Sequence, residues 1–140
     1  MHVEIWHNPA CGTSRNTLAL IRNAGIEPLI VDYLQAPLEK ARLRQAISDA
    51  GLSVRDAIRS KQPEYAAQGL GDMSLSDDAL LDAMLETPVL INRPFVFTPV
   101  GTRLCRPDSS IVLEILPACE TPFCKEDGEV VIDVSGKRVR

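Results

Sequence analysis

Cys11 lies in a run of residues suited to nucleophilic thiol chemistry. Residues 7–16 read HNPACGTSRN, and Asn8-Pro9 marks a turn between a short apolar run and a helical pattern. Cys11 is therefore expected at the N-terminal end of a helix, where backbone N–H groups carry roughly half a positive charge. That environment stabilises a thiolate and lowers the pKa of a cysteine below about 8.5. The pattern favours a reactive thiol over a small core residue at a turn.

The first turn of the same helix is suited to binding an anion. Its backbone N–H groups have no partners within the helix and favour negative charge. We expect these donors to come from Gly12, Thr13 and Ser14. Thr13 and Ser14 also carry hydroxyl groups, but a plain helix cap explains these equally well. His7 and Arg15 offer polarising partners for Cys11, although a packed or surface position explains His7 as readily.

Three arginines are predicted to converge on the same anion. Arg93 precedes one predicted strand and Arg106 follows the next, at strand ends expected beside Cys11. Arg59 closes a short helix in the middle of the chain. A guanidinium group presents a planar fork of donors that matches oxyanions, and its charge lowers the pKa of a neighbouring thiol. For any one arginine taken alone, a solvated surface charge is the other interpretation.

The remaining cysteines are Cys105, Cys119 and Cys124, and none of the four has zinc-ligand spacing such as C-x-x-C. We therefore predict no metal site. Cys105 lies in an aliphatic strand and is expected to be structural. Cys119 and Cys124 have three open interpretations: a redox pair, a resolving thiol, or incidental exposed side chains.

The composition is typical of a soluble protein with one core. The chain has 140 residues, of which 45% are hydrophobic, and a formal net charge of −4. An acidic balance argues against a nucleic-acid surface, and no apolar run approaches the ~20 residues needed to cross a bilayer. The N-terminus has no signal-peptide pattern. We expect a cytoplasmic protein, without a nucleic-acid or membrane partner, whose cysteines are free thiols.

The N-terminal part is predicted to form a βαβ unit. A strand at 3–6 precedes the Cys11 loop. A helix then runs from Thr13 or Ser14 and ends at Gly25, before a second strand at 28–33. This is about the minimum size for such a unit.

A ββα unit is predicted farther along the chain. Strands at 95–98 and 102–105 form a hairpin, with Gly101 available for positive φ. Asp108 or Ser109 then caps a last helix. Beyond that helix, an apolar run at 130–132 is either a loop or a marginal strand.

Between these units the chain is predicted to be helical, over roughly 38–87. The expected elements are a helix at 38–50, a short helix after a Ser53 capping box, a helical turn opened by Pro63 and a helix capped by Ser76. The order βαβ, helical insertion, ββα is a thioredoxin-like α/β arrangement. We expect it to form a single domain over 1–140.

Four segments resemble the glutaredoxin-coupled arsenate reductase family. They are HNPACGTSRNT at 7–17, LINRP at 90–94, TPVGTRLCRP at 98–107 and KEDG at 125–128. The resemblance covers nearly the whole chain and implies a thioredoxin-like fold with an inserted helical region. In that fold Arg93-Pro94 is where a cis peptide bond is expected.

The resemblance implies an oxidoreductase, an arsenate reductase with no bound cofactor. It implies that Cys11 attacks arsenate and that His7 assists Cys11. It matches Arg59, Arg93 and Arg106 to the family's oxyanion-binding arginines. Glutathione is the implied co-substrate, and glutaredoxin removes it as a mixed disulfide while arsenite leaves.

Two other classes of protein stay open. Thioredoxin-fold regulators that sense redox state by binding RNA polymerase typically carry C-x-x-C where this chain has Cys11-Gly-Thr-Ser14. Ser14 removes the partner thiol, so a disulfide cannot form within this loop. An inert binding relative is the third class, and it would tolerate loss of the arginines.

Overall fold

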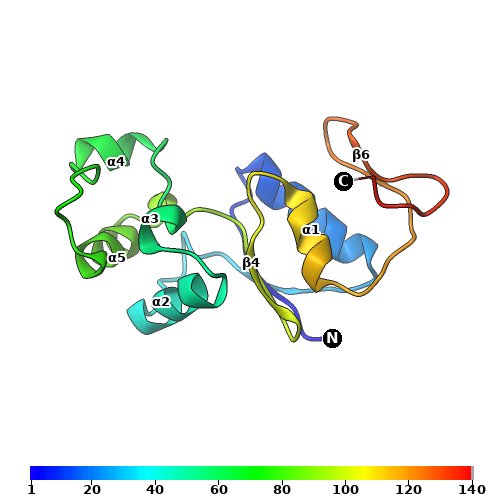
Figure 1. Ribbon diagram of the computed structural model, residues 1–140, viewed down its shortest axis with the longest axis horizontal. Coiled ribbons are helices and arrows are strands. Elements are labelled where there is room, and N and C mark those ends of the chain that lie inside the picture. Colours follow the sequence, from blue (N-terminus) through cyan, green and yellow to red (C-terminus); the bar gives the residue numbers. More distant parts are fainter. Residues whose placement is uncertain (140) are drawn as a thin grey trace. The chain divides into compact units, whose positions relative to one another are not determined.

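The computed structural model describes residues 1–139, which form two compact units (Figure 1). Unit 1 comprises residues 1–31 and the chain from Arg93 onward, and unit 2 comprises residues 32–92. The helical insertion predicted at roughly 38–87 falls within unit 2. The single domain expected over 1–140 stays a prediction.

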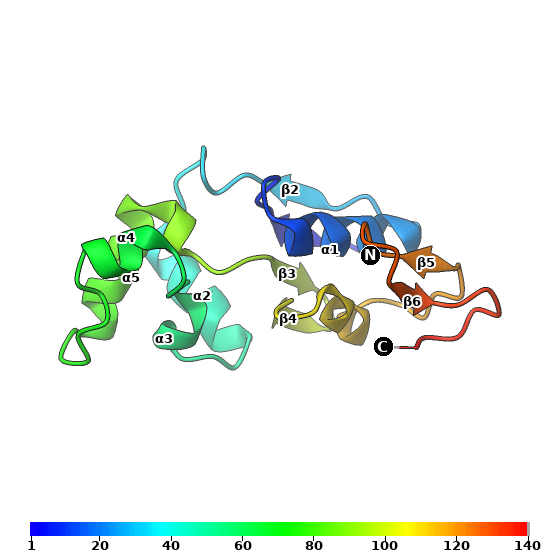
Figure 2. The same ribbon diagram turned by 90° about the horizontal axis from the view of Figure 1, so that it is seen from above.

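Unit 1 is built on a four-stranded sheet in the order β2-β1-β3-β4 (Figure 2). The strands are β1 (Glu4–Trp6), β2 (Leu29–Val31), β3 (Phe95–Thr98) and β4 (Gly101–Leu104). β1 and β2 run parallel, whereas β3 is antiparallel to both β1 and β4. A βαβ unit and a β-hairpin therefore share one sheet, which confirms the predicted thioredoxin-like α/β fold.

The helix α1 (Gly12–Asn23) connects β1 to β2 and packs against the 3₁₀ helix η2 (Ser109–Ile115). The core of unit 1 that these elements enclose is aliphatic. It contains Val3, Ile5, Leu18, Leu20, Ile21, Val96, Cys105, Val112, Ile115, Leu116, Val131 and Ile132. α1 stops before Gly25 as predicted, because Gly25 has a φ of 81° that favours glycine.

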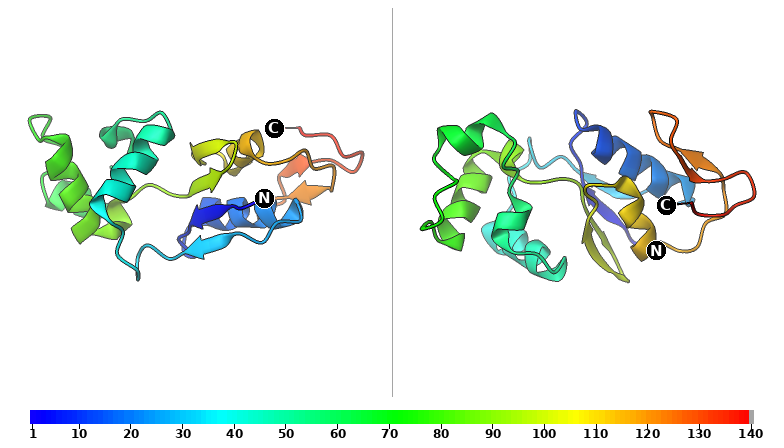
Figure 3. Two further views of the ribbon diagram at one scale, coloured as in Figure 1. Left: turned by 90° about the horizontal axis from the view of Figure 1, so that it is seen from below. Right: turned by 45° about the horizontal axis from the view of Figure 1, so that its top comes forward.

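After η2 the chain forms a second, two-stranded sheet from β5 (Phe123–Cys124) and β6 (Val130–Ile132). The apolar run at 130–132 is thus a strand rather than a loop. Val131 and Ile132 are buried in the unit 1 core, which gives this short pair the packing that an isolated hairpin lacks. Both views in Figure 3 show the hairpin beside α1.

The regular elements of unit 2 are helices. They are α2 (Lys40–Asp49), α3 (Val54–Ala57), α4 (Pro63–Ala67), α5 (Asp77–Glu86) and the 3₁₀ helix η1 (Pro88–Leu90). α5 packs against α2, α3 and η1. Two predicted caps are confirmed: Ser53 forms a capping box with Asp56, and Ser76 accepts a hydrogen bond from the Ala79 N–H.

Two local predictions in unit 1 are wrong. The last helix is 3₁₀ rather than α, and its buried Ser109, Val112 and Ile115 are spaced as three residues per turn requires. Gly101 does not adopt a positive φ. It lies inside β4, where it pairs with Thr98, because the two residues between them make the turn.

Candidate active site

Cys11 is the N-cap residue of α1. Its backbone is extended, with φ −98° and ψ 121°, and Gly12 is the first helical residue. The Cys11 N–H donates to the Asn8 carbonyl at 3.0 Å, and the Cys11 carbonyl accepts from the Arg15 N–H at 3.0 Å. These bonds hold a partly buried thiol at the helix N-terminus.

The sheet brings Arg93 and Arg106 to the same place. Trp6 at the end of β1 pairs with Phe95 at the start of β3, and Phe95 pairs with Leu104 at the end of β4. Because both pairs are antiparallel, the chain that leaves β1, the chain that enters β3 and the chain that leaves β4 lie at one end of the sheet. The positions of both arginines near the Cys11 loop follow from this register.

Arg106 contacts Cys11 directly. Its Nη1 lies 3.4 Å from Cys11 Sγ and also donates to the Arg93 carbonyl at 2.8 Å. The Arg93-Pro94 peptide bond is cis, as the family resemblance implies, and so is the Arg106-Pro107 bond. Arg93 is buried, with 7% of its surface exposed. The structure therefore brings together three of the predicted site residues.

Hydrogen bonds lower the pKa of Cys11 to about 7. Burial alone raises the pKa of this thiol, because it disfavours the charged form. Hydrogen bonds from the Ser14 N–H and from the guanidinium groups of Arg106 and Arg93 outweigh burial, and the charge of Arg106 adds to them. A substantial fraction of Cys11 is therefore thiolate at neutral pH, and the thiolate is the nucleophilic form.

His7 and Ser14 form a buried pair next to this thiol loop. His7 Nδ1 lies 2.6 Å from Ser14 Oγ, which also accepts the Asn8 N–H at 3.1 Å. Both side chains are buried. His7 thus contacts the residue whose backbone N–H faces Cys11, and its assistance to catalysis stays a prediction.

Gly12 and Thr13 begin α1, and the Arg15 guanidinium lies close to Gly12. A Cβ atom on Gly12 would lie 3.6 Å from Arg15 Nη2. Arg15 Nη1 donates to the Pro9 carbonyl at 2.8 Å, while Nε and Nη2 bind Glu126 at 2.8 and 3.1 Å. Sequence reasoning missed this approach of Glu126. The signal that could have revealed it is the KEDG segment at 125–128, which contains Glu126. The family resemblance includes this segment, but no role was assigned to it from the sequence.

Arg59 lies in unit 2, two residues after the end of α3. Its N–H donates to the Leu90 carbonyl at 2.7 Å, and its carbonyl accepts from the Gln62 N–H at 3.1 Å. These contacts define its place within unit 2 alone. Its convergence with Arg93 and Arg106 on one anion stays a prediction.

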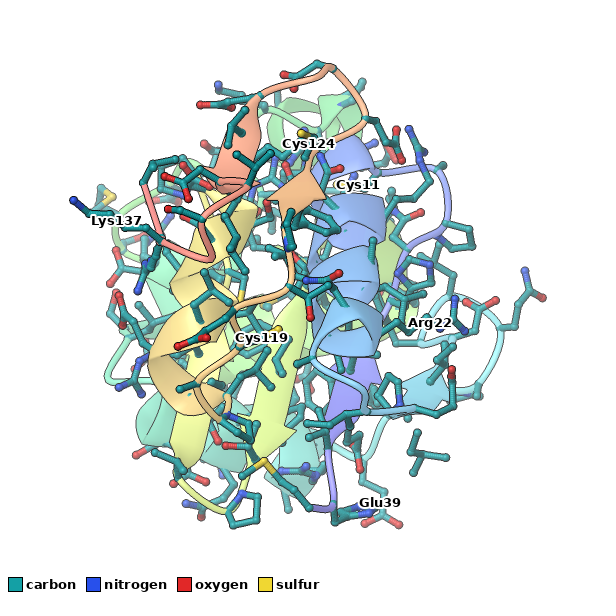
Figure 4. The ribbon with its side chains drawn as sticks, turned by 90° about the vertical axis from the view of Figure 1, so that its right-hand side faces the viewer. Cys11, Arg22, Glu39, Cys119, Cys124 and Lys137 are labelled. Carbon is teal, nitrogen blue, oxygen red and sulfur yellow. The ribbon has the colours of Figure 1, made fainter. Side chains whose placement is uncertain are left out.

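All four cysteines are free thiols. Cys105 is fully buried, as expected for a structural residue, and burial raises its pKa. Cys119 Sγ lies 3.5 Å from the Asn23 carbonyl at the C-terminal end of α1. Figure 4 shows Cys11 and Cys124 toward the other end of this helix.

Within residues 1–139, no helix combines the length and the apolar character that a membrane span requires. Over the same residues, His, Cys, Asp and Glu side chains form no group of three or more able to hold a metal ion.

The fold and the site together define a thioredoxin-like thiol protein, with an acidic cysteine at the start of its first helix and arginines beside it. The model of the ArsC family matches residues 6–112, a range that includes Cys11, Arg93 and Arg106. The chain therefore belongs to the ArsC family, which confirms the family resemblance predicted from its motifs.

Named relatives match the whole length of the chain. A protein named arsenate reductase in Rhizobium meliloti (strain 1021) is 64% identical over 140 residues, which is 99% of each chain. An arsenate reductase of Escherichia coli (strain K12) is 54% identical over the same shares. Among solved structures, the arsenate reductase from Vibrio cholerae is 45% identical with a TM-score of 0.79, covering 83% of this chain and 98% of that one.

Proposed function

We propose that the protein reduces arsenate to arsenite, with Cys11 as the nucleophile and with glutathione and glutaredoxin as electron donors. The names of the relatives support arsenate as the substrate. The single observation that carries the proposal is the 3.4 Å contact between Cys11 Sγ and Arg106 Nη1. It sets an acidic thiol beside a cation, which is the combination that attack on an oxyanion requires.

The first step forms a bond between Cys11 Sγ and arsenic. The thiolate displaces one oxygen of arsenate, which takes up two protons and leaves as water. Arg93 and Arg106 hold the remaining oxygens, together with Arg59, which the family resemblance assigns to the same task. The N–H groups of the first turn of α1, from Gly12, Thr13 and Ser14, supply further donors where negative charge develops.

The reduction itself oxidises two thiols other than Cys11 to one disulfide, because arsenic(V) takes up two electrons to become arsenic(III). Ser14 stands where a C-x-x-C loop has its second cysteine, and the family resemblance assigns the first of the two thiols to glutathione, which bonds to arsenic and displaces another oxygen as water. A glutaredoxin thiolate then attacks the bound glutathione sulfur. The arsenic–sulfur bond breaks with its electron pair left on arsenic, and a mixed disulfide forms. Water finally releases arsenite and restores the Cys11 thiol.

His7 is proposed to assist Cys11 through Ser14. Its 2.6 Å contact with Ser14 Oγ orients the turn whose N–H faces the thiol. We also propose a cytoplasmic location with no bound cofactor, because the reaction consumes reduced glutathione and the cytoplasm keeps thiols reduced.

The test is arsenate-dependent NADPH oxidation in the presence of glutathione, glutathione reductase and glutaredoxin. Cys11→Ser should lower turnover at least about 10³-fold, because it removes the nucleophile. Cys124→Ser is the matched control, since it changes an exposed thiol on β5, and it should keep wild-type turnover. Normal turnover by Cys11→Ser contradicts the mechanism. Absence of turnover by the wild-type protein contradicts the function.

A further inference from the structure

The turn between β5 and β6 contacts two segments of the candidate active site, the start of α1 and the chain that follows β4. This turn, residues 125–128, is closed by a hydrogen bond from the Gly128 N–H to the Lys125 carbonyl at 2.9 Å. Cys124, the residue before it, lies with Cys11 toward the same end of α1 in Figure 4. Lys125 and Glu126 are adjacent in the chain, yet the Lys125 side chain binds Asp108 and the Glu126 side chain binds Arg15 of α1.

Lys125 holds the loop that carries Arg106. Its Nζ lies 2.9 Å from Asp108 Oδ1 and 3.1 Å from Glu129 Oε2, and its side chain is only 11% exposed. Asp108 Oδ1 also accepts the Ser110 N–H at 2.9 Å. Burial alone raises the pKa of Asp108, but Ser110 and Lys125 lower it to about 2. Asp108 is therefore a firmly held carboxylate, two residues beyond Arg106.

Glu126 holds the turn that carries Cys11. Its carboxylate binds Arg15 through two hydrogen bonds, of 2.8 and 3.1 Å, and its N–H donates to Asn16 Oδ1 at 3.0 Å. Arg15 in turn donates to the Pro9 carbonyl at 2.8 Å. Glu126 thus binds α1 directly after Cys11, and through Arg15 it is linked to the chain before Cys11.

We propose that residues 125 and 126 form a clamp that keeps Arg106 against Cys11 Sγ, and that Lys125 and Glu126 are positioning residues for the reaction. The inference rests on the proposed function for the chemistry that it serves. Cys11 and Arg106 are 95 positions apart in sequence. Glu126 binds the start of α1 directly after Cys11, and Lys125 binds Asp108, two residues beyond Arg106. Hydrogen bonds weaken steeply as their geometry degrades, so a small separation of the two segments would weaken the bond from Arg106 to Cys11 Sγ. The effect of burial, which raises the pKa of Cys11, would then be less opposed.

The most informative variant is Asp108→Asn, because the clamp and simple electrostatics predict opposite changes in the pKa of Cys11. The substitution removes the charge of Asp108 and so weakens its contact with Lys125, and it keeps an oxygen that accepts the Ser110 N–H. Loss of a negative charge near Cys11 would by itself lower the thiol pKa. Loss of the clamp raises that pKa, because Arg106 no longer stays in contact with Sγ.

A second variant weakens the other half of the clamp without changing any charge. Asn16→Ala deletes the side chain that accepts the Glu126 N–H and leaves the Arg15–Glu126 pair in place. The matched control is Glu27→Gln, which weakens the Arg22–Glu27 pair. That pair also joins an arginine of α1 to an exposed glutamate, but it has no contact with residues 125 and 126 in the described chain.

The measurement is the pH dependence of iodoacetamide alkylation of Cys11, followed by mass spectrometry of its peptide, alongside kcat/KM for arsenate. We expect the Cys11 pKa to rise by about half a pH unit in Asp108→Asn and in Asn16→Ala, equivalent to about threefold in thiolate stabilisation. kcat/KM should fall about threefold or more in both, and Glu27→Gln should match the wild type.

A lowered or unchanged Cys11 pKa in both variants, with cooperative thermal unfolding retained, overturns the clamp. A rise in only one variant overturns it too, because it assigns positioning to one contact alone. If the wild-type protein fails to reduce arsenate while both pKa values rise, the proposed function is wrong and the clamp stands.

Discussion

Cys11 and Cys105 are two thiols of the same unit with opposite chemistry. Cys105 follows β4, is fully buried in the aliphatic core, and has a raised pKa because of its burial and of the negative charge of Glu114. Cys11 lies partly buried at the N-terminus of α1, with a pKa lowered to about 7. One is a core residue and the other is the proposed nucleophile.

The two thiols differ in pKa because the guanidinium of Arg106 donates to one of them and not to the other. Arg106 is the neighbour of Cys105 in sequence, yet its Nη1 donates to Cys11 Sγ. Arg103 lowers the pKa of Cys105 only weakly against burial, and its own guanidinium lies 3.3 Å from Glu114. A cation close in sequence therefore does not make a thiol acidic. The register of β1, β3 and β4 decides which thiol receives the guanidinium group.

The largest effect should separate the two thiols in alkylation of the native protein. Cys11 should react with iodoacetamide with a midpoint near its pKa of about 7. Cys105 should react only when the core opens, at least about 10³-fold more slowly. Timed labelling followed by mass spectrometry of the two peptides measures both rates. Comparable rates in the folded protein would contradict the contrast between the two sites.

The next effect should come from Arg106→Ala, which removes the donor that distinguishes the thiols. We expect kcat/KM for arsenate to fall about 10²–10³-fold and the Cys11 pKa to move toward about 8.5. Arg106→Lys keeps the charge without the planar fork and should be intermediate. Arg103→Ala is the control beside Cys105, and steady-state kinetics should change by less than about twofold. Equal losses in Arg103→Ala and Arg106→Ala would remove Arg106 from its special role.

Local features of the site were predictable from the sequence. The Asn8-Pro9 turn and the helical pattern that follows it place Cys11 at a helix start, because both signals come from neighbouring residues. The same holds for the end of α1 at Gly25 and for the Ser53 cap, each confirmed by backbone geometry. The order of the predicted elements, a βαβ unit followed by helices and a ββα unit, then indicated a thioredoxin-like sheet.

Contacts between distant segments were not predictable in this way. The pairing of Arg15 with Glu126 joins residues 111 positions apart, and no periodicity in either segment reports on the other. The 3₁₀ geometry of η2 also escaped prediction, since its apolar residues fit α and 3₁₀ spacing over so short a length. Arg59 lies in unit 2, so its role rests on the family resemblance alone.

The two thiols should also differ in stability, where Cys105 and not Cys11 should have the larger effect. Cys105→Ser places a hydroxyl group in an aliphatic core and should cost about 1–3 kcal/mol of unfolding free energy. Cys11→Ser changes a partly exposed side chain and should cost less than about 1 kcal/mol, although we expect it to abolish turnover. Urea unfolding of both variants measures these costs. A larger stability loss in Cys11→Ser than in Cys105→Ser would contradict the assignment of Cys105 to the core.

The smallest effect is a difference in how stability depends on pH. The folded-state pKa of Cys11 is about 7, below the value of about 8.5 for an unfolded cysteine. Between these values the unfolded chain binds more protons, so Cys11 makes the protein more stable as pH rises, and this contribution is lost as pH falls through 7. Solvent screening of a partly exposed group keeps it below about 1 kcal/mol.

Cys105 should act with the opposite sign, because its pKa is raised in the folded state. Above about pH 8.5 the unfolded chain releases its proton first, so Cys105 lowers stability as pH rises further. Urea unfolding across this range should show a shallower rise below pH 8.5 in Cys11→Ala and a shallower fall above it in Cys105→Ala. If both substitutions changed the same limb of the plot of unfolding free energy against pH, the two thiols would have similar electrostatic environments. The hydrogen-bond donors around Cys11 would then not explain how it differs from Cys105.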